Sequence, residues 1–242
     1  MPLPQILPYR VTRNEFVTEH VIQLECVSAE GVERPSFVAG QFMMLHWKDE
    51  LGDLIDKPHA YSIASAPQEE GFIFSIKIYG PYTTRLSQEP KLGSIVHLQG
   101  PYGLFTLQKV QNERVVLLAG GVGIAPFRSM ILDELTRIPI HSFHILYSNK
   151  TKSSFPFKEE LDTLSLQHPK NLKVSYTITQ DGDPDWTGHR GRWTAESIKK
   201  EIGDGGETTF FVCGPPPFVV EMQDQLAKMG VEKNKVKVEK FT

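Results

Sequence analysis

A glycine-rich turn at residues 121–126 constrains this chain of 242 residues more than any other feature. The turn reads Gly-Val-Gly-Ile-Ala-Pro; it follows the apolar run 115–119 and precedes an amphipathic stretch. A strand that ends in glycines and leads into a helix forms an anion cradle, because the first N–H groups of the helix have no intrahelical acceptor. Pro126 stands where the common dinucleotide fingerprint has its third glycine. A plain strand-to-helix turn without a ligand therefore stays an alternative.

The composition is that of a globular protein with enough apolar material for a core. Hydrophobic residues make up 40% of the chain and charged residues 23%, and the formal net charge is −3. This charge gives no reason to expect nucleic acid as a partner. No apolar run approaches the ~20 residues that span a bilayer, and the N-terminus lacks the layout of a signal peptide. We expect a cytoplasmic protein with no integral membrane segment.

Cysteine and histidine usage argues against a metal centre. The chain has only Cys26 and Cys213, which excludes a disulfide framework and a four-thiolate iron–sulfur cluster supplied by this chain alone. His141 and His144 lie three residues apart in or beside an expected strand, where their side chains would point to opposite faces. We expect no metal site.

The first 110 residues alternate short β-rich runs with glycine and proline. Many short strands at this spacing are typical of an antiparallel β-barrel or a sandwich. The runs are Val21–Val27, Gln41–Trp47, Tyr61–Ala64, Phe72–Tyr79 and Ser94–Leu98.

From residue 111 onward, expected strands alternate with expected helices, with Thr194 as an N-cap and Gly230 as a helix stop. This alternation predicts a parallel sheet with helices packed on it. The sequence thus predicts two domains, a β-barrel at 1–110 and an α/β domain at 111–242. The strands are Arg114–Gly120, Phe143–Ser148, Val174–Thr179, Thr208–Cys213 and Val236–Phe241; the helices are Pro126–Arg137, Phe157–Leu166, Ala195–Ile202 and Pro217–Met229.

Two segments are expected in the cleft between the domains, because open parallel sheets bind ligands beyond the C-terminal ends of their strands. One is the turn at 121–126. The other is Cys213-Gly214-Pro215-Pro216-Pro217, whose glycine and prolines force an abrupt exit from the strand. This exit would hold the Cys213 thiol at the mouth of the cleft. The alternative is that Cys213 is a small buried apolar residue.

Five motifs then occur in one order along the chain: Tyr-Ser-Ile-Ala-Ser from residue 61, Gly-x-x-Thr-x-x-Leu from 80, Gly-Pro-x-Gly-x-Phe from 100, Gly-x-Gly-Ile-Ala-Pro from 121, and Cys-Gly-Pro-Pro-Pro from 213. Each is compatible with ordinary structure, but the ordered series resembles the ferredoxin–NADP reductase family over almost the whole chain. The resemblance implies that the barrel binds FAD, with FMN less favoured, and that the second domain binds NAD(P)H. It also implies that hydride passes from the nicotinamide C4 to the flavin N5.

The resemblance assigns roles by position. Ser62, near the flavin N5, and Cys213, beside the nicotinamide, are the implied catalytic residues. Tyr61 would pack on the isoalloxazine. The other implied flavin contacts are His59, the backbone of Lys77 and Ile78, Thr83 and Thr84 at the phosphate, and the C-terminal aromatic Phe241, which covers flavin or adenine in relatives. The implied nucleotide contacts are Gly121, Gly123, Ile124, Ala125, Gly214 and Pro215.

One position departs from the family pattern, which has Arg-x-Tyr-Ser where this chain has His59 before Tyr61 and Ser62. Arginine is always charged and grips phosphate with two hydrogen bonds, whereas a neutral histidine offers at most one donor. Lys57 or Arg85 would take over part of that role. We expect weaker flavin retention.

Two segments bear on the choice between NADH and NADPH. Tyr147-Ser148-Asn149-Lys150, with no acidic residue at the end of its strand, would tolerate a 2′-phosphate. The segment Thr179-Gln180-Asp181 carries an acidic group that would repel one, and the balance leans slightly toward NADH. The chain has no iron–sulfur relay of its own, so the expected partner is an electron-acceptor protein such as ferredoxin, flavodoxin or an oxygenase or complex subunit. Two alternatives stay open: a quinone or small-oxidant reductase, and a flavin-poor interaction subunit of a redox complex.

Overall fold

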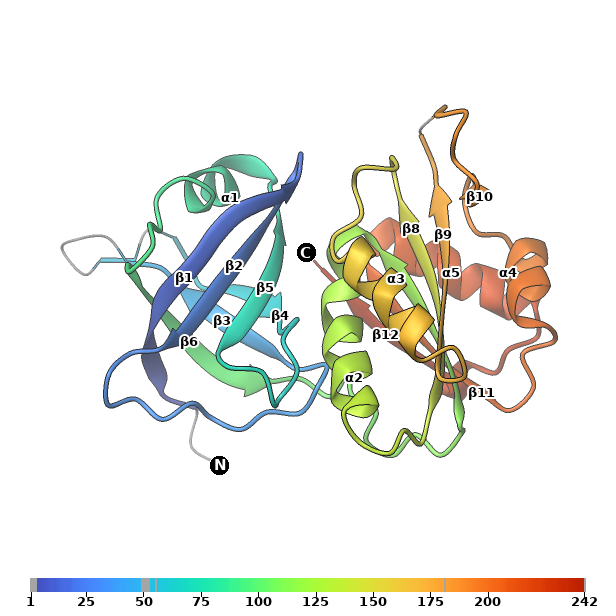
Figure 1. Ribbon diagram of the computed structural model, residues 1–242, viewed down its shortest axis with the longest axis horizontal. Helices are drawn as coiled ribbons and strands as arrows, with labels where there is room; N and C mark the ends of the chain where they lie inside the picture. Colours follow the sequence, from blue (N-terminus) through green and yellow to red (C-terminus); the bar gives the residue numbers. More distant parts are fainter. Residues whose placement is uncertain (1–3, 49–52, 55, 181, 242) are drawn as a thin grey trace.

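Two six-stranded sheets organise the chain, one from each half of the sequence. The structure is a computed structural model that describes residues 4–48, 53–54, 56–180 and 182–241. The two sheets lie side by side, with α2 between them (Figure 1). The predicted fold class, an antiparallel barrel followed by a parallel α/β unit, is confirmed. The proposed domain limits, 1–110 and 111–242, stay a prediction.

The first sheet is antiparallel, with strand order β4-β3-β6-β1-β2-β5. Its two edge strands approach each other, and the N–H of Ala64 after β4 donates to the carbonyl of Ile73 in β5 at 2.7 Å. The sheet therefore curls toward a barrel around an apolar core. The strands are β1 Ile6–Thr18, β2 Val21–Ser28, β3 Phe42–His46, β4 His59–Ser62, β5 Phe72–Lys77 and β6 Ile95–Tyr102, and α1 spans Gly80–Leu86.

The second sheet is parallel throughout, with strand order β10-β9-β8-β7-β11-β12. The strands are β7 Arg114–Gly120, β8 Ser142–Asn149, β9 Leu172–Ile178, β10 His189–Arg190, β11 Thr208–Gly214 and β12 Val236–Lys240. The helices are η1 Gly121–Ile124, α2 Ala125–Leu135, α3 Lys158–Gln167, α4 Ala195–Ile202, α5 Pro216–Lys228 and η2 Lys233–Lys235.

Alternate residues of β7 face two separate cores, as the period of two in a strand requires. Leu117 and Ala119 pack in the core that α2 and α3 cover, whereas Val116 and Leu118 pack in the core that α4 and α5 cover. Helices therefore lie on both faces of the sheet (Figure 1). In the part of the chain that the structure describes, no helix combines the length and the apolar character that crossing a membrane requires.

Helix α2 ties the two sheets together through a group that we name the interdomain clasp: Arg128 and Ser129 of α2 with Ala64, Ser65 and Glu69 of the barrel. The Arg128 side chain donates to the Ala64 carbonyl at 2.8 Å and to both oxygens of Glu69 at 2.9 and 3.0 Å. The Ser129 hydroxyl donates to the Ser65 carbonyl at 2.6 Å. Arg128 is only 6% exposed, so these bonds form in a region from which water is largely excluded.

His144 is held neutral on the α4 side of the sheet. Its Nε2 lies 2.9 Å from the Ser175 hydroxyl, which donates to a carboxylate oxygen of Glu201 at 2.7 Å. Burial, together with the nearby charge of Lys173, lowers the pKa of His144 to about 4. His141 instead lies 3.0 Å from Glu134 at the end of α2, on the other side of the sheet.

This buried histidine predicts an acid-sensitive fold. Because the pKa of His144 is about 6.5 in the unfolded chain and about 4 in the folded chain, the unfolded chain takes up a proton first as the pH falls. We expect His144 to cost about 3 kcal/mol of stability between roughly pH 6.5 and pH 4. Urea unfolding across that range measures the loss, and His144→Gln should flatten it. An identical pH profile in that variant would contradict the prediction.

Candidate functional site at the junction of the two sheets

The C-terminal ends of β7 and β11 lie next to each other in the middle of the parallel sheet. β7 has β8 as its neighbour on one side and β11, followed by β12, on the other. The chain connections therefore leave this point in opposite directions. Such a switch point is where open parallel sheets bind ligands. The structure places both predicted segments here, the turn at 121–126 after β7 and the segment 213–217 after β11.

Gly123 joins these two segments by direct backbone contact. A Cβ atom built on Gly123 would lie 2.2 Å from the Cys213 carbonyl oxygen and 2.9 Å from the Gly214 nitrogen. Only glycine therefore allows the turn to pack on the end of β11. The two glycine motifs, about ninety positions apart in sequence, form one structural unit.

The turn at 121–126 has no side chain that caps the start of η1 or of α2. Gly121 has φ +58°, and a Cβ atom on it would meet nothing closer than Asn149 Oδ1 at 3.9 Å, so space is open on this side. The side chains of Ile124 and Ala125 are buried in the core, and the N–H of Ala125 already donates to the Val122 carbonyl.

Three side chains from three strands meet at the junction. The Ser62 hydroxyl of β4 donates to Glu239 Oε1 of β12 at 3.0 Å, and the Cys213 sulfur of β11 lies 3.9 Å from the same oxygen. Burial raises the pKa of Glu239 and that of the Cys213 thiol. Burial thus favours the protonated forms of both groups, and the cluster lies where the barrel contacts the parallel sheet.

Glu239 is the residue that sequence reasoning missed. It lies opposite Cys213 in the parallel pairing of β11 and β12, in a segment that reads only as a lysine-rich final strand. Glu239 stands between Val238 and Lys240 in the sequence, so no local pattern marks it, and its place in the site depends on the register of the last strand.

Cys213 does not lie at the mouth of a cleft, as the sequence led us to expect. It is completely buried and belongs to the core beneath α2, because β7 and β12 flank β11 and η1 packs on its end. The exposed Pro215 makes the abrupt turn instead, at the start of α5. Phe241 is partly buried against the same core, and its N–H donates to the Gly214 carbonyl at 3.2 Å.

The barrel residues expected to contact a flavin follow β4 and β5. Tyr61 is partly buried against Phe74 with 6.4 Å between ring centroids, and burial raises its pKa. Lys77 is exposed at the end of β5. The N–H of Ile78 is already used, because it donates to the His20 carbonyl at 2.8 Å.

His59 stacks on Tyr82 of α1, with 4.0 Å between ring centroids and 20° between planes. Its Nε2 lies 3.2 Å from Asp56. The Tyr82 hydroxyl is buried and has no hydrogen-bond partner in the described part of the chain. An orphaned buried hydroxyl of this kind calls for a ligand or water.

Thr83 and Thr84 belong to the short helix α1. The Thr83 hydroxyl accepts from the Tyr79 N–H at 2.6 Å, and the Thr84 hydroxyl donates to the Gly80 carbonyl at 2.9 Å. Both hydroxyls are therefore engaged in starting α1. Proline at position 81 in the first turn favours this helix.

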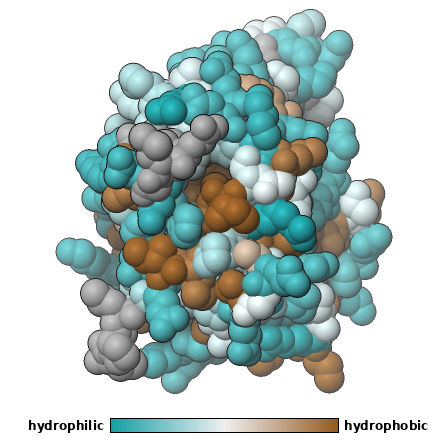
Figure 2. All heavy atoms as spheres, turned by 90° about the vertical axis from the view of Figure 1, so that its left-hand side faces the viewer, coloured by the Kyte–Doolittle hydropathy of each residue, from teal (hydrophilic) through white to brown (hydrophobic). Residues whose placement is uncertain are grey.

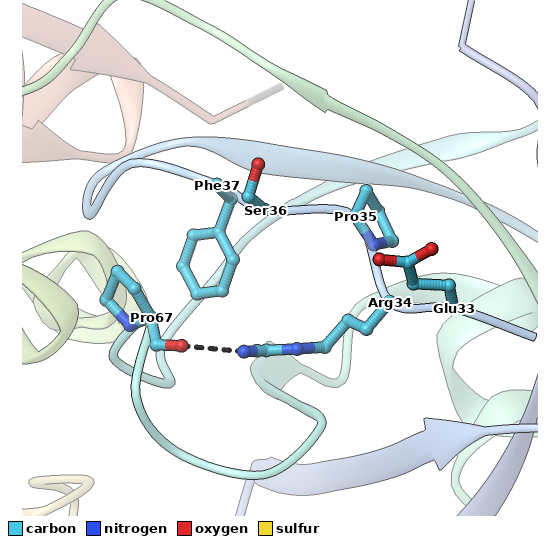
Figure 3. A pocket seen from close by; sticks show the side chains of 6 residues that line it. All are labelled: Glu33, Arg34, Pro35, Ser36, Phe37 and Pro67. Atoms are coloured by element: carbon cyan, nitrogen blue, oxygen red, sulfur yellow. Dashed lines mark hydrogen bonds between the residues drawn. The ribbon is translucent and has the colours of Figure 1, made fainter.

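Two surface pockets lie in the barrel away from the junction. One, of about 420 Å³, is lined by Glu33, Arg34, Pro35, Ser36, Phe37 and Pro67. Arg34 reaches across this pocket to the Pro67 carbonyl at 2.6 Å, beside the Phe37 ring (Figure 3). A second of about 430 Å³ adjoins it and shares Arg34. None of the residues predicted to bind a cofactor lines either pocket.

The end of the barrel that points away from the parallel sheet carries an apolar hollow bordered by polar side chains (Figure 2). The barrel also has several large apolar side chains that are more than 40% exposed: Ile6, Phe16, Leu54, Leu92 and Ile95. Apolar surface of this kind is typical of faces that bind a ligand or a partner.

Comparison with known proteins identifies the second half of the chain. Residues 117–224 match the family described as the oxidoreductase NAD-binding domain. The chain is 28% identical over 233 residues to flavohemoprotein B of Dictyostelium discoideum, covering 88% of this chain and 53% of that protein. It is 32% identical over 151 residues to NADH-cytochrome b5 reductase 1 of Candida albicans, covering 60% and 49%. The chain thus spans about half the length of these two relatives.

The fold comparison covers both halves. A ferredoxin NADP+ reductase from Neisseria gonorrhoeae, solved with bound FAD and NADP, superposes with a TM-score of 0.82 at 21% identity, covering 98% of this chain and 99% of that one. The chain therefore has the two-domain fold of this ferredoxin NADP+ reductase, and its residues 117–224 match the oxidoreductase NAD-binding domain family.

Proposed function

We propose that this chain is an FAD-dependent NAD(P)H reductase that passes electrons to a protein acceptor. The observation that carries the proposal is the meeting of Ser62 from the barrel with Cys213 and Glu239 from the parallel sheet. Because the two sheets touch here, groups bound to the barrel and to the parallel sheet would be brought close together at this junction. Holding two reactants in such an arrangement is worth about 7–11 kcal/mol of barrier.

The barrel residues fit FAD. The orphaned Tyr82 hydroxyl lies beside His59 and near the start of α1, where a polar ligand would satisfy it. We assign the isoalloxazine to Tyr61 and Ser62, and the phosphate to His59, Thr83 and Thr84. The backbone of Lys77 and Ile78 and the ring of Phe241 complete the proposed contacts.

The parallel-sheet residues fit a pyridine dinucleotide. Gly121 leaves space over uncapped helix N–H groups, which favour a pyrophosphate. We assign the pyrophosphate to Gly121, Gly123 and the backbone of Ile124 and Ala125. The nicotinamide is assigned to Cys213, Gly214 and Pro215.

When bound, FAD would supply hydride acceptance from the nicotinamide and release of single electrons, chemistry that no side chain offers. The chain orients the two rings and controls one proton. Ser62 donates a hydrogen bond at the junction, and Glu239, with its raised pKa, holds or releases a proton there. The buried Cys213 thiol fills space and excludes water.

NADH is the proposed electron donor. Asp181 lies outside the described residues, but Asp183 follows in the same loop. The backbone N–H of Asp185 and the Lys152 ammonium group lower the pKa of Asp183, so it is ionised at neutral pH. Lys152 pairs with Asp183 at 3.1 Å and offsets its charge, so the expected repulsion of a 2′-phosphate rests on Asp181. The Candida albicans relative is an NADH enzyme by name. A comparison of kcat/KM for NADH and NADPH tests the preference.

Turnover with defined acceptors tests the proposal. Protein loaded with FAD should oxidise NADH and reduce a cytochrome b5, a ferredoxin or a flavodoxin faster than it reduces a quinone. Protein that takes up no FAD would refute the proposal. Protein that takes up FAD but reduces only quinones or dioxygen would refute the protein-acceptor half of it.

His59 gives the proposed phosphate site a weaker contact than an arginine would. A neutral histidine offers at most one donor, whereas arginine is always charged and grips phosphate with two hydrogen bonds. We therefore expect His59→Arg to tighten FAD binding. Equilibrium dialysis of the wild type and the variant at one pH measures the ratio of the two Kd values. Equal FAD affinity in the two proteins, with Lys57→Ala also unchanged, would contradict the role given to His59.

A further inference from the structure

Besides the direct hydrogen bond from Ser62 to Glu239, the interdomain clasp connects the two halves of the proposed site through short chain segments. Ala64 follows Ser62 by two residues, and Arg128 follows Ala125 by three. A single hydrogen bond of 2.8 Å, from the Arg128 guanidinium to the Ala64 carbonyl, joins these two short segments. The next residue on each side repeats the connection, because Ser129 donates to the Ser65 carbonyl.

From this geometry we infer that the interdomain clasp sets the spacing between Ser62 and the turn at 121–125, so that Arg128 is a positioning residue for hydride transfer. The inference rests on the proposed function. Arg128 touches none of the predicted cofactor-binding side chains in the described hydrogen bonds. It acts on the loop that continues β4 and on the helix that begins at Ala125.

Two glutamates hold the same guanidinium in nearly the same way, and only one of them crosses between the sheets. Glu69 of the barrel accepts two hydrogen bonds from Arg128 at 2.9 and 3.0 Å, and Glu160 of α3 accepts two at 2.6 and 2.7 Å. Their side chains are 32% and 35% exposed. Glu160 belongs to the same half of the chain as Arg128, so its ion pair does not link the sheets.

This pair of glutamates provides a matched experiment. Glu69→Gln weakens the connection between the sheets, and Glu160→Gln weakens an ion pair of the same kind within one half. Both variants keep the size of the side chain. If Arg128 has only a structural role, the rate of flavin reduction should fall by a similar factor in both variants.

The first readout is the rate of flavin reduction at saturating NADH, measured anaerobically in the stopped flow with NADH and with C4-deuterated NADH. A displacement on the order of 1 Å between reacting groups costs roughly 100-fold in rate. We expect Glu69→Gln to slow reduction at least about 10-fold and to increase the deuterium isotope effect, with the Kd for NADH unchanged. The rate of flavin reduction in Glu160→Gln should stay within about twofold of the wild-type rate. Ser129→Ala, which removes the clasp's hydrogen bond to the Ser65 carbonyl, should shift the rate in the same direction as Glu69→Gln.

The second readout needs no cofactor. Spin labels on Leu92→Cys in the barrel and Leu166→Cys in α3 report the distance between the halves by pulsed EPR, since both positions are at least 70% exposed and the native cysteines are buried. The distance distribution should broaden in Glu69→Gln and stay narrow in Glu160→Gln.

The two readouts separate failure of this inference from failure of the proposed function. Equal rates and equal EPR distributions in the two variants would overturn the positioning role of Arg128. A wild-type protein that binds no FAD, or whose FAD is not reduced by NADH, would overturn the proposed function, and the EPR comparison would still decide whether the clasp fixes the spacing.

Discussion

Arg128→Met should destabilise the protein more than any other single charge removal that we can identify. Arg128 is 6% exposed and ion-paired with both Glu69 and Glu160, so its loss leaves two partly buried carboxylates facing each other. Removing one partner from a buried ionic network costs about 3–5 kcal/mol. For a chain of this size the melting temperature should fall by roughly 10 °C or more, as calorimetry would show.

Arg137→Met, just beyond the C-terminal end of α2, is the control for this prediction. Arg137 pairs with Asp133, but its side chain is 69% exposed. Exposed ion pairs contribute about 0–1 kcal/mol, because water screens the charges. Similar falls in melting temperature in the two variants would show that the buried ion pairs of Arg128 stabilise the protein no more than an exposed ion pair does.

Gly123→Ala should disrupt the junction itself. The added methyl group would lie 2.2 Å from the Cys213 carbonyl oxygen and 2.6 Å from its carbon, and both are backbone atoms that no rotamer change can move. The turn must then separate from β11. We expect a loss of about 3 kcal/mol from overpacking, together with loss of NADH-dependent flavin reduction by roughly 100-fold.

Gly182→Ala is the matched control for Gly123→Ala. A Cβ atom on Gly182 would meet no atom within 4 Å, and the residue lies outside the helices and strands. The melting temperature should be almost unchanged. If Gly123→Ala has the melting temperature of the wild type and the same rate of flavin reduction by NADH, the packing of the turn against β11 would be contradicted.

The fold could be predicted from the sequence where the periodicity of apolar residues agrees with the positions of turn-forming residues. Buried strands of the parallel sheet are short apolar runs, each followed by a turn signal, and their predicted bounds lie close to those in the structure. The sequence did not predict strand β1, because only Tyr9 and Val11 of its thirteen residues are buried and Pro8 interrupts the pattern. Helix α1 was not predicted either, because the dipeptide Gly80-Pro81 is equally typical of a turn.

The candidate site was predictable only in part. Glycine motifs report on local backbone geometry, so the turn at 121–126 and the segment after β11 could be found from their own residues. The contact between Ser62 and Glu239 joins residues 177 positions apart and depends on the register of β12 against β11, which no local pattern determines. The clasp was likewise invisible, because a lone arginine in an apolar helix does not reveal its partners.

The most direct test of the central claim is anaerobic addition of NADH to the wild-type protein loaded with FAD. The claim is that the junction of the two sheets brings a flavin and a pyridine dinucleotide together. We expect stoichiometric FAD uptake, rapid bleaching of the flavin absorption by one equivalent of NADH, and slower bleaching with C4-deuterated NADH. Protein that stays colourless after incubation with FAD, or bound flavin whose spectrum NADH leaves unchanged, would contradict the account.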